Sequence, residues 1–236
     1  SVMSSEDKSW LNYRSRFADV YHESNYSSPL QSIVMEASHR LTEKPFQKYE
    51  HFSKVLEVGV GPGEHLPFVR HSFDQYVLTD LDAKTLSVAR NNLKGKHDGK
   101  LLFEIQNGAE LSYEDNSFDR LIATHVLEHV YQPHLVLKEW RRVVKNGGLL
   151  SILVPTDPGL AWRLGRNLGP RKSALAQGID YDYVMAREHV NSCNNLIALM
   201  RHYFSERREA WWPFPIPSID LNLFFVFHAI VHKPGI

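Results

Sequence analysis

Three glycines alternate in the loop that follows the apolar run Val55–Val58, as Gly59, Gly61 and Gly63. Glycine at such positions permits a positive φ angle and lets backbone N–H groups approach a bound ligand closely. Asp80 stands 17 residues after the last of them, at the end of the next apolar run, where a carboxylate can bind ribose hydroxyls. Together these residues predict a pocket for an adenosine-type ligand. The alternative is a glycine turn before a helix with an unrelated surface aspartate.

The spacing of the glycines indicates which adenosine compound the loop binds. Dinucleotide sites usually have the pattern GxGxxG, whose extra residue seats a pyrophosphate at a helix N-terminus. Here the pattern is GxGxG, with Glu57 before it and Glu64 directly after it. A carboxylate in this place is unfavourable beside a pyrophosphate but acceptable beside an ammonium and a sulfonium centre. The loop therefore favours S-adenosylmethionine (SAM) over a nicotinamide dinucleotide.

A second chemical pattern is His125-Val126-Leu127-Glu128-His129, which has the HxxEH form of inverted zinc peptidases. Two histidines four residues apart on a helix can share a zinc ion, with the glutamate as base. His125 is expected at the end of a strand instead, so we predict no metal site. A neutral imidazole with a pKa near ~6.5 can accept a proton, which makes His129 and His125 candidate general bases. For each of them, a packed and hydrogen-bonded histidine is the alternative.

Short apolar runs alternate with helical patterns between residues 54 and 154, which is typical of βαβ units around a parallel sheet. The expected strands are Val55–Val58, Tyr76–Thr79, Leu101–Ile105, Arg120–Thr124 and Leu149–Val154. The expected helices are Glu64–Phe73, Ala83–Leu93 and Pro133–Lys145. Two further runs, Arg207–Trp212 and Leu221–His232, are close enough to pair as a hairpin. We therefore expect an α/β fold with a Rossmann-like, doubly wound sheet, mostly parallel with one antiparallel strand near the C-terminus.

Changes in composition and periodicity divide the chain into four parts. Residues 1–50 have the pattern of amphipathic helices, which form either a lid over the ligand or a packing face. Residues 51–154 form the ligand-binding core. Residues 155–188, rich in proline, glycine, arginine and aromatic residues, are interpreted as a cap insertion. Residues 189–236 complete the core with a helix, expected at Glu188–Tyr203, and the strand hairpin.

Three segments carry a resemblance to a known family. VLEVGVGPGEH resembles motif I of the class I SAM-dependent methyltransferases, and LTDLDAKTLSVAR resembles the segment that follows it. NGAELSYEDNSFDRLIATHVLEHV is similar to a stretch typical of the small-molecule branch that includes ubiquinone- and menaquinone-biosynthesis enzymes. The resemblance covers roughly residues 54–155 with matching order and spacing. It implies SAM as the cofactor and S-adenosylhomocysteine (SAH) as the product.

The resemblance also implies a set of cofactor-binding residues. These are Glu57, Gly59, Gly61, Gly63, Asp80, Leu81, Asn107, Gly108 and Thr124. In this family Glu57 would order the glycine loop and the amino group of the ligand, Asp80 would bind the ribose diol, and Leu81 would pack on the adenine. Asn107 stands where the family usually has aspartate, although asparagine can still accept a hydrogen bond through its side-chain oxygen.

The choice of acceptor is expected to depend on the parts outside the glycine core. The candidate acceptor-binding residues are Tyr21, Trp162, Arg163, Tyr183, Glu188 and His189. Basic residues in the cap suit a phosphate or carboxylate, and its aromatic and acidic residues suit a sugar ring or polar natural product, but solvated helix faces and ordinary packing explain them equally. We expect O- or N-methylation of a small polar acceptor. Alignment of nucleophile, methyl carbon and sulfur supplies much of the ~7–11 kcal/mol available from orientation.

Composition narrows the possible partners. The 236 residues have a formal net charge of 0 and 1 cysteine, so no overall field recruits nucleic acid or membrane, and no internal disulfide is expected. We expect a cytoplasmic monomer or homodimer without membrane insertion. One rival is an NAD-binding oxidoreductase, which would need a catalytic tyrosine–lysine pair after the fourth strand. Another is a non-catalytic SAM-fold partner protein, which would have an eroded glycine loop, whereas this loop is intact.

Overall fold

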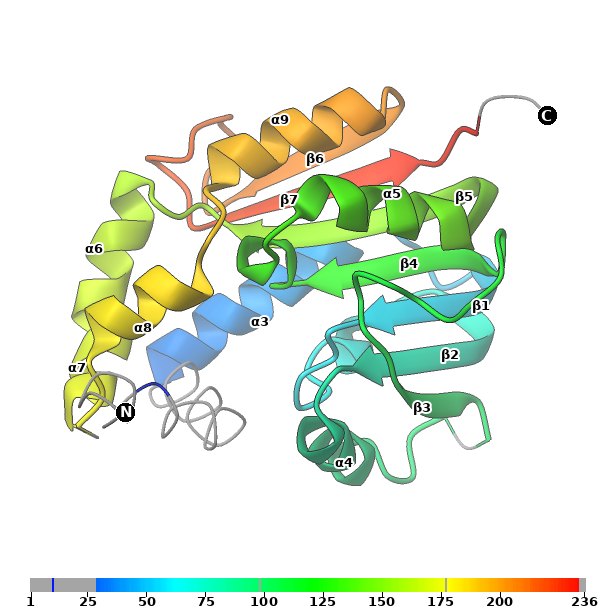
Figure 1. The fold of residues 1–236 in the computed structure, drawn as a ribbon, viewed down its shortest axis with the longest axis horizontal. Helices are drawn as coiled ribbons and strands as arrows, with labels where there is room; N and C mark the ends of the chain where they lie inside the picture. Colours follow the sequence, from blue (N-terminus) through cyan, green and yellow to red (C-terminus); the bar gives the residue numbers. More distant parts are fainter. Residues whose placement is uncertain (1–9, 11–28, 98, 177, 234–236) are drawn as a thin grey trace, which may run out of the picture.

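The computed structural model describes residues 10, 29–97, 99–176 and 178–233. At its centre is a seven-stranded sheet with the order β3-β2-β1-β4-β5-β7-β6 (Figure 1). The strands are β1 (His51–Val58), β2 (Ser72–Asp80), β3 (Leu101–Ile105), β4 (Phe118–Thr124), β5 (Val144–Pro155), β6 (Arg207–Trp212) and β7 (Phe224–Ile230). β7 is antiparallel to β5 and β6, and the other neighbouring strands are parallel. The expected Rossmann-like sheet with one antiparallel strand near the C-terminus is confirmed.

Helices cover both faces of the sheet. They are α3 (Pro29–Glu43), α4 (Ala83–Asn92), α5 (Pro133–Val143), α6 (Leu160–Leu168), α7 (Pro170–Ala176), α8 (Tyr181–Glu188) and α9 (Cys193–Tyr203), with the short 3-10 turns η1 (Leu66–Phe68) and η2 (Leu127–His129). α5 and α9 lie on one face, α3 crosses the other, and α6, α7 and α8 stand beyond the carboxyl ends of the parallel strands (Figure 1). None of the helices in the described part of the chain has the length and apolar character to cross a membrane.

The two faces of the sheet have separate cores because successive side chains of a strand point in opposite directions. Leu56 and Leu121 join the larger core, which packs under α5 and α9 around Trp140. Val55 and Ile122 point the other way, into a second core that includes α4. All five side chains are fully buried or nearly so. Burial of each aliphatic side chain contributes about 1.5–3 kcal/mol to folding, so this packing fixes the strand ends that carry the glycine loop and η2.

The predicted helix Glu64–Phe73 is wrong. The segment contains only the turn η1, and β2 begins at Ser72, four residues earlier than the predicted strand start at Tyr76. Pro67 lies in the first turn of η1, where its missing N–H group is tolerated. In a helix that began at Glu64 and continued to Phe73, the same proline would lie further inside, where an N–H donor is needed. Ser72 instead pairs with His51, so the sheet extends into the segment expected to be helical.

The predicted helix Glu188–Tyr203 is also interrupted. α8 ends at Glu188, and α9 begins only at Cys193. The reason is a new N-cap, because the side chain of Ser192 accepts a hydrogen bond from the Asn195 N–H and so starts a separate helix. The segment between the two helices, residues 189–192, is therefore irregular.

A buried ion pair anchors α3 to the sheet. Arg120 of β4 is 0% exposed, and its Nη1 and Nη2 atoms donate to the two carboxylate oxygens of Glu43 at 3.0 and 2.7 Å. Its Nη2 also donates to Ser151 at 3.1 Å, and its guanidinium lies 3.9 Å from the ring centroid of Phe46. Burial alone would raise the pKa of Glu43, but the Arg120 charge and a hydrogen bond from His65 hold that pKa well below its usual range. Glu43 is therefore ionised, and the end of α3 is fixed over β4.

Replacing Glu43 by glutamine leaves the Arg120 charge buried without a counter-ion. We expect Glu43→Gln to lower the free energy of unfolding at neutral pH by about 3–5 kcal/mol, measured by urea denaturation. The control is Asp182→Asn, which removes the partner of Arg171 in an exposed pair and should cost below about 1 kcal/mol. Equal losses in the two variants would contradict the structural role of the buried pair.

Acidification should reduce the difference in free energy of unfolding between the wild type and Glu43→Gln. Folding lowers the pKa of Glu43, so its stabilising contribution is complete above the unfolded-state pKa of about 4.3 and is lost as the pH falls toward the folded-state pKa. Urea denaturation repeated over a series of acidic pH values should therefore show the wild type approaching Glu43→Gln.

Candidate functional site

A cavity of about 640 Å³ lies at the carboxyl ends of β1, β2 and β4, within the size range of cofactor sites. Its walls are the glycine loop, the segment after β2, the turn after β3 and η2. The predicted cofactor residues that line it are Gly59, Gly61, Asp80, Leu81, Asn107, Gly108 and Thr124. Residues that are far apart in the sequence therefore meet around one space, as the resemblance implied.

The glycine loop adopts the conformation that its residues favour. Gly59, Gly61 and Gly63 have φ angles of 67°, 54° and 87°. A Cβ atom on Gly59 would lie 2.6 Å from Cγ2 of Val126, which itself lines the cavity. A Cβ atom on Gly63 would lie 3.0 Å from Cδ1 of Leu93, behind the loop. Gly63 therefore packs the loop against the end of α4 and does not line the cavity.

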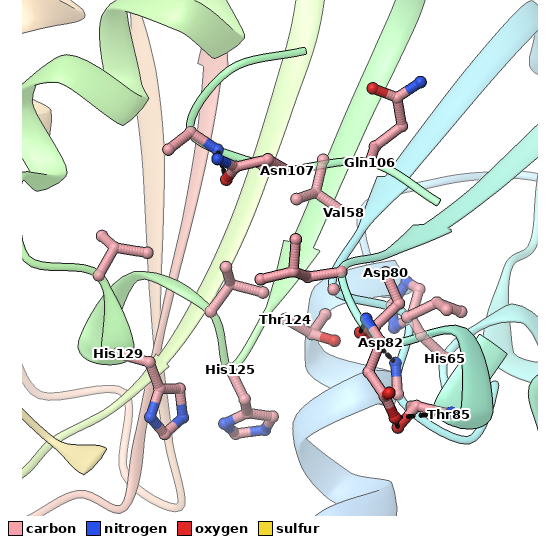
Figure 2. Close-up of a pocket in the computed structure, with 18 of the residues that line it drawn as sticks. Val58, His65, Asp80, Asp82, Thr85, Gln106, Asn107, Thr124, His125 and His129 are labelled. Atoms are coloured by element: carbon pink, nitrogen blue, oxygen red, sulfur yellow. Dashed lines mark hydrogen bonds between the residues drawn. The ribbon is translucent and has the colours of Figure 1, made fainter. Parts of the chain in front are cut away.

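Asp80 both supports the loop and borders the cavity (Figure 2). Its Oδ2 accepts a hydrogen bond from the Gly61 N–H at 3.1 Å, and its Oδ1 accepts one from the Asp82 N–H at 3.0 Å. Burial raises the pKa of this carboxyl group, and those hydrogen bonds oppose the rise. Asp82 in turn caps α4 by accepting from the Thr85 N–H at 2.9 Å. Leu81, which is 68% exposed, is left at the cavity wall as an apolar surface for a ring.

Glu57 lies beneath the loop and not in the cavity wall. It is 1% exposed, and its Oε2 accepts a hydrogen bond from the Tyr76 hydroxyl at 2.6 Å. Burial raises the pKa of Glu57. Its expected role in ordering the loop fits this position, whereas its contact with the amino group of a ligand stays a prediction.

Asn107 and Gly108 line the cavity in the turn after β3, where Asn107 is seen in Figure 2. The Asn107 Oδ1 accepts from the Ala109 N–H at 3.0 Å, so the oxygen expected to receive an adenine amino group already has one partner. The Gly108 carbonyl accepts from the Trp140 indole at 2.9 Å, and a Cβ atom at this position would lie 2.6 Å from Cγ1 of Val58. Glycine is therefore required here by close packing.

The turn after β4 carries both predicted bases. His125 has a φ angle of 57°, which is uncommon for a residue other than glycine, and its N–H donates to the Leu153 carbonyl at 2.9 Å. Its Nδ1 lies 3.6 Å from Oε1 of Glu128. Nε2 of His129 lies 3.7 Å from the same oxygen, and its Nδ1 lies 2.9 Å from the Glu188 carbonyl oxygen. The two imidazoles lie side by side at the cavity wall (Figure 2).

The charges around η2 favour ionised side chains. Burial lowers the pKa of His129, but the Glu128 and Glu188 carboxylates outweigh it and raise that pKa. Burial raises the pKa of Glu128, but His129 and His125 outweigh it and lower that pKa. These neighbours stabilise the protonated form of His129, which does not suit a free neutral base. The base roles of His129 and His125 stay predictions.

A second cavity of about 330 Å³, here called the chamber, lies between α3 and the cap and meets the first cavity at His125, His129 and Glu188. Most of its lining is apolar, from Leu30, Val34, Met35, Pro155, Trp162, Leu168, Pro170, Ala174, Ile179, Val184, Met185, Leu223 and Phe224. The three residues shared with the first cavity are polar, and the other polar lining residues are Gln31, Glu128, Arg166, Tyr181 and His189. The chamber is therefore an apolar space with a polar end beside η2.

The predicted acceptor residues separate into two groups. Trp162, Glu188 and His189 line the chamber. Arg163 and Tyr183 line neither cavity. On α6, residues 162 and 166 share the face toward the chamber, so the residue at 163 is turned away from it. The Tyr183 hydroxyl instead accepts from Arg187 at 3.1 Å. Tyr21 lies outside the described residues.

Two wall residues of the first cavity, His39 and His65, escaped sequence reasoning. Their Nδ1 atoms are 3.1 Å apart, and the Nε2 atom of His65 lies 3.0 Å from Glu43, which joins the cavity to the buried ion pair. The available signal was the helical spacing of Met35, His39 and Glu43, which marks one face of α3. That spacing reveals a packed face but not what the face meets.

Comparison with known protein families decides what this core is. A sequence profile described as "Methyltransferase domain" matches residues 56–152, from the first strand through the glycine loop to β5. This core is a class I SAM-dependent methyltransferase domain. The cofactor of the family is SAM. The binding of SAM by the residues around the first cavity stays a prediction.

Relatives of the methyltransferase domain include a protein named as a methyltransferase and a polyketide synthase-nonribosomal peptide synthetase. Methyltransferase GfsG of Streptomyces halstedii is 29% identical over 145 residues, which make up 59% of this chain and 52% of that protein. The polyketide synthase-nonribosomal peptide synthetase ACE1 of Pyricularia oryzae is 31% identical over 163 residues, 65% of this chain and 4% of that protein. The chain thus spans about half the length of GfsG and a small part of ACE1.

Solved structures show the same fold. Phosphoethanolamine N-methyltransferase 2 of Haemonchus contortus, in complex with SAM, superimposes with a TM-score of 0.61 at 13% identity, covering 99% of this chain and 61% of that one. At this level of identity the likeness concerns the fold alone.

The close approach at Gly59 gives a test of the cofactor cavity. Gly59→Ala should weaken SAH binding at least about tenfold, because the added methyl group both strains a positive φ angle and displaces Val126 at the cavity wall. Gly147→Ala is the matched control, since φ there is 78° and nothing lies within 4 Å of the added Cβ. We expect Gly147→Ala to lose stability and keep SAH affinity in calorimetric titrations. Equal SAH affinity in both variants would show that the Gly59 wall does not contact the ligand.

Proposed function

We propose that the protein transfers a methyl group from SAM to an oxygen or nitrogen atom of an acceptor with a largely apolar body. The observation that supports this is the meeting of two cavities at His125, His129 and Glu188. One cavity is lined by the cofactor residues of the family, and the other is lined by apolar side chains. A donor in the first and an acceptor in the second would have their reacting atoms at the shared wall.

SAM would lie in the first cavity in a single orientation. Asp80 and Leu81 would hold the ribose and adenine on the side of β2. Gly59 and Thr124 would hold the methionine part at the ends of β1 and β4. The sulfonium methyl group is then directed toward η2. Methyl transfer requires mainly that nucleophile, methyl carbon and sulfur be in line, and two rigid cavities that share a wall can impose this alignment.

The acceptor proposed here differs from the polar molecule that the cap sequence alone favoured. Aromatic and acidic residues of the cap suggested a sugar, but the chamber receives Trp162 together with aliphatic side chains from α3, α7 and α8. Such a lining favours a hydrocarbon chain or ring system, with few polar groups at defined places. Arg166 lines the chamber, and its guanidinium can hold one carboxylate or phosphate of the acceptor.

The cofactor half of the proposed function is tested by Asp80→Ala. We expect this variant to abolish SAH binding in calorimetric titrations, because it removes the ribose-binding carboxylate and the support of the Gly61 N–H. Asp74→Ala, on an exposed part of the same strand, should bind SAH like the wild type. Tight NAD binding by a wild-type protein that does not bind SAH would overturn the proposed function.

The acceptor half is tested by narrowing the chamber. Labelled SAM would be screened against apolar alcohols, amines and phenols, with sugars as the polar comparison. Met185→Trp should then lower turnover of the best acceptor about 100-fold while SAH affinity is unchanged, because the larger side chain displaces the acceptor. Ala186→Trp, on the exposed side of α8, should keep full turnover. Preference for sugars, or equal turnover in both variants, would contradict an apolar acceptor in the chamber.

A further inference from the structure

Three side chains with metal-binding atoms converge on the wall of the chamber. Glu128, His129 and His189 each offer one ligand atom, and these atoms lie within 4.8 Å of one another. Glu128 and His129 belong to η2, and His189 follows α8 directly. We propose that these three side chains bind one divalent transition-metal ion. Two imidazole nitrogens and one carboxylate oxygen form a ligand set suited to Zn²⁺ and to similar ions of the first transition row.

The outer nitrogens of both imidazoles are already engaged. Nδ1 of His189 lies 2.8 Å from Oδ2 of Asp157, and Nδ1 of His129 lies 2.9 Å from the carbonyl oxygen of Glu188. Metal binding requires the neutral imidazoles, in which a hydrogen on each Nδ1 satisfies these acceptors and leaves Nε2 as the nitrogen with a free lone pair. Metal-binding histidines almost always have such a carboxylate or carbonyl partner, which fixes the tautomer and the ring orientation.

Glu128 provides a second, independent observation. Its side chain is buried, with the residue 2% exposed, and its Oε2 has no hydrogen-bond partner in the described part of the chain. Its Oε1 lies 3.6 Å from His125 and 3.7 Å from His129, and both distances exceed an ordinary hydrogen bond. A buried carboxylate oxygen without a hydrogen bond is unfavourable. A cation between Glu128 and the two imidazoles would supply the missing partner.

The backbone holds the ligands in register. The Glu128 carbonyl accepts hydrogen bonds from the N–H groups of Val190 and Asn191 at 2.9 and 3.2 Å. The Cys193 N–H donates to the Asp157 carbonyl at 2.8 Å. The irregular segment between α8 and α9 is thus tied both to η2 and to the loop that carries Asp157. Such a supported arrangement holds ligands close to their binding geometry before an ion arrives.

The ligand set is not the one that the HxxEH pattern suggested. That pattern pairs His125 with His129 on a helix, but here His125 lies at a strand end with a positive φ angle. His189, which is 60 residues after His129 in the sequence, takes its place. Three protein ligands leave one position of a four-coordinate ion for an oxygen atom. The use of that position by an acceptor oxygen rests on the proposed methyl transfer, whereas ion binding itself does not.

The test is metal binding by the full chain after treatment with EDTA and dialysis. Titration with Zn²⁺ in a calorimeter should give one ion per chain, and Co²⁺ should give the absorption bands of a nitrogen- and oxygen-bound ion. His189→Ala should lower the Zn²⁺ affinity at least about 100-fold, and Asp157→Asn, which alters only the outer partner, about 10- to 100-fold. His134→Ala, an exposed histidine on α5, should have no effect. Circular dichroism would show that each variant is folded.

A second readout does not depend on catalysis. Zn²⁺ should raise the thermal unfolding midpoint of the wild type but not that of His189→Ala, because an ion that binds only the folded state stabilises it. Equal Zn²⁺ affinity in the wild type and His189→Ala, or no stoichiometric binding, would overturn the metal site. SAH titration of the EDTA-treated protein separates the two ideas. Intact SAH binding without Zn²⁺ binding would reject the metal site alone.

Discussion

A positive charge buried in the middle of a sheet requires a negative charge from elsewhere in the chain, and much of this molecule is arranged around that requirement. Arg120 lies on the face of β4 that α3 covers, and Glu43, 77 residues away in the sequence, meets it with both oxygens. Because an unpaired buried charge is strongly unfavourable, the end of α3 is held at this point. Its earlier turns then place His39 at the cofactor cavity and Met35 at the chamber. The ion pair thus positions one wall of each cavity.

The cofactor side could be predicted from the sequence because its signals are local. The apolar runs gave the strands, the glycines gave the turn at Gly59–Gly63, and the acidic residue at the end of the next strand gave Asp80. Errors arose where tertiary pairing overrode local pattern. The spacing after the glycine loop predicted a helix, but β2 begins early there because Ser72 pairs with His51 of β1. The N-cap at Ser192, which begins a new helix, is a single residue within a longer helical pattern, so the pattern did not indicate the break.

The chamber could not be predicted from the sequence for a physical reason. Its lining comes from η2, α3, three cap helices and the loop before β7, and no periodicity in one of these elements tells which others it faces. Trp162 lines the chamber, but its neighbour Arg163 does not, because one residue along a helix turns the side chain by about 100°. The pairing of His189 with Asp157, and the approach of His189 to Glu128, depend on how α8 and α9 are joined.

The turn after β4 is where these two halves become one site. Thr124 lines the cofactor cavity, and five residues later His129 borders both spaces. A continuous strand or helix through this segment would direct its side chains along a regular path, whereas the positive φ angle at His125 reverses the chain and keeps η2 at the boundary. Such a conformation costs ~1–2 kcal/mol for a residue with a Cβ atom. The hydrogen bond from the His125 N–H to Leu153 holds it in place. The local strain is therefore offset by the sheet, and the sheet in turn determines where the two cavities meet.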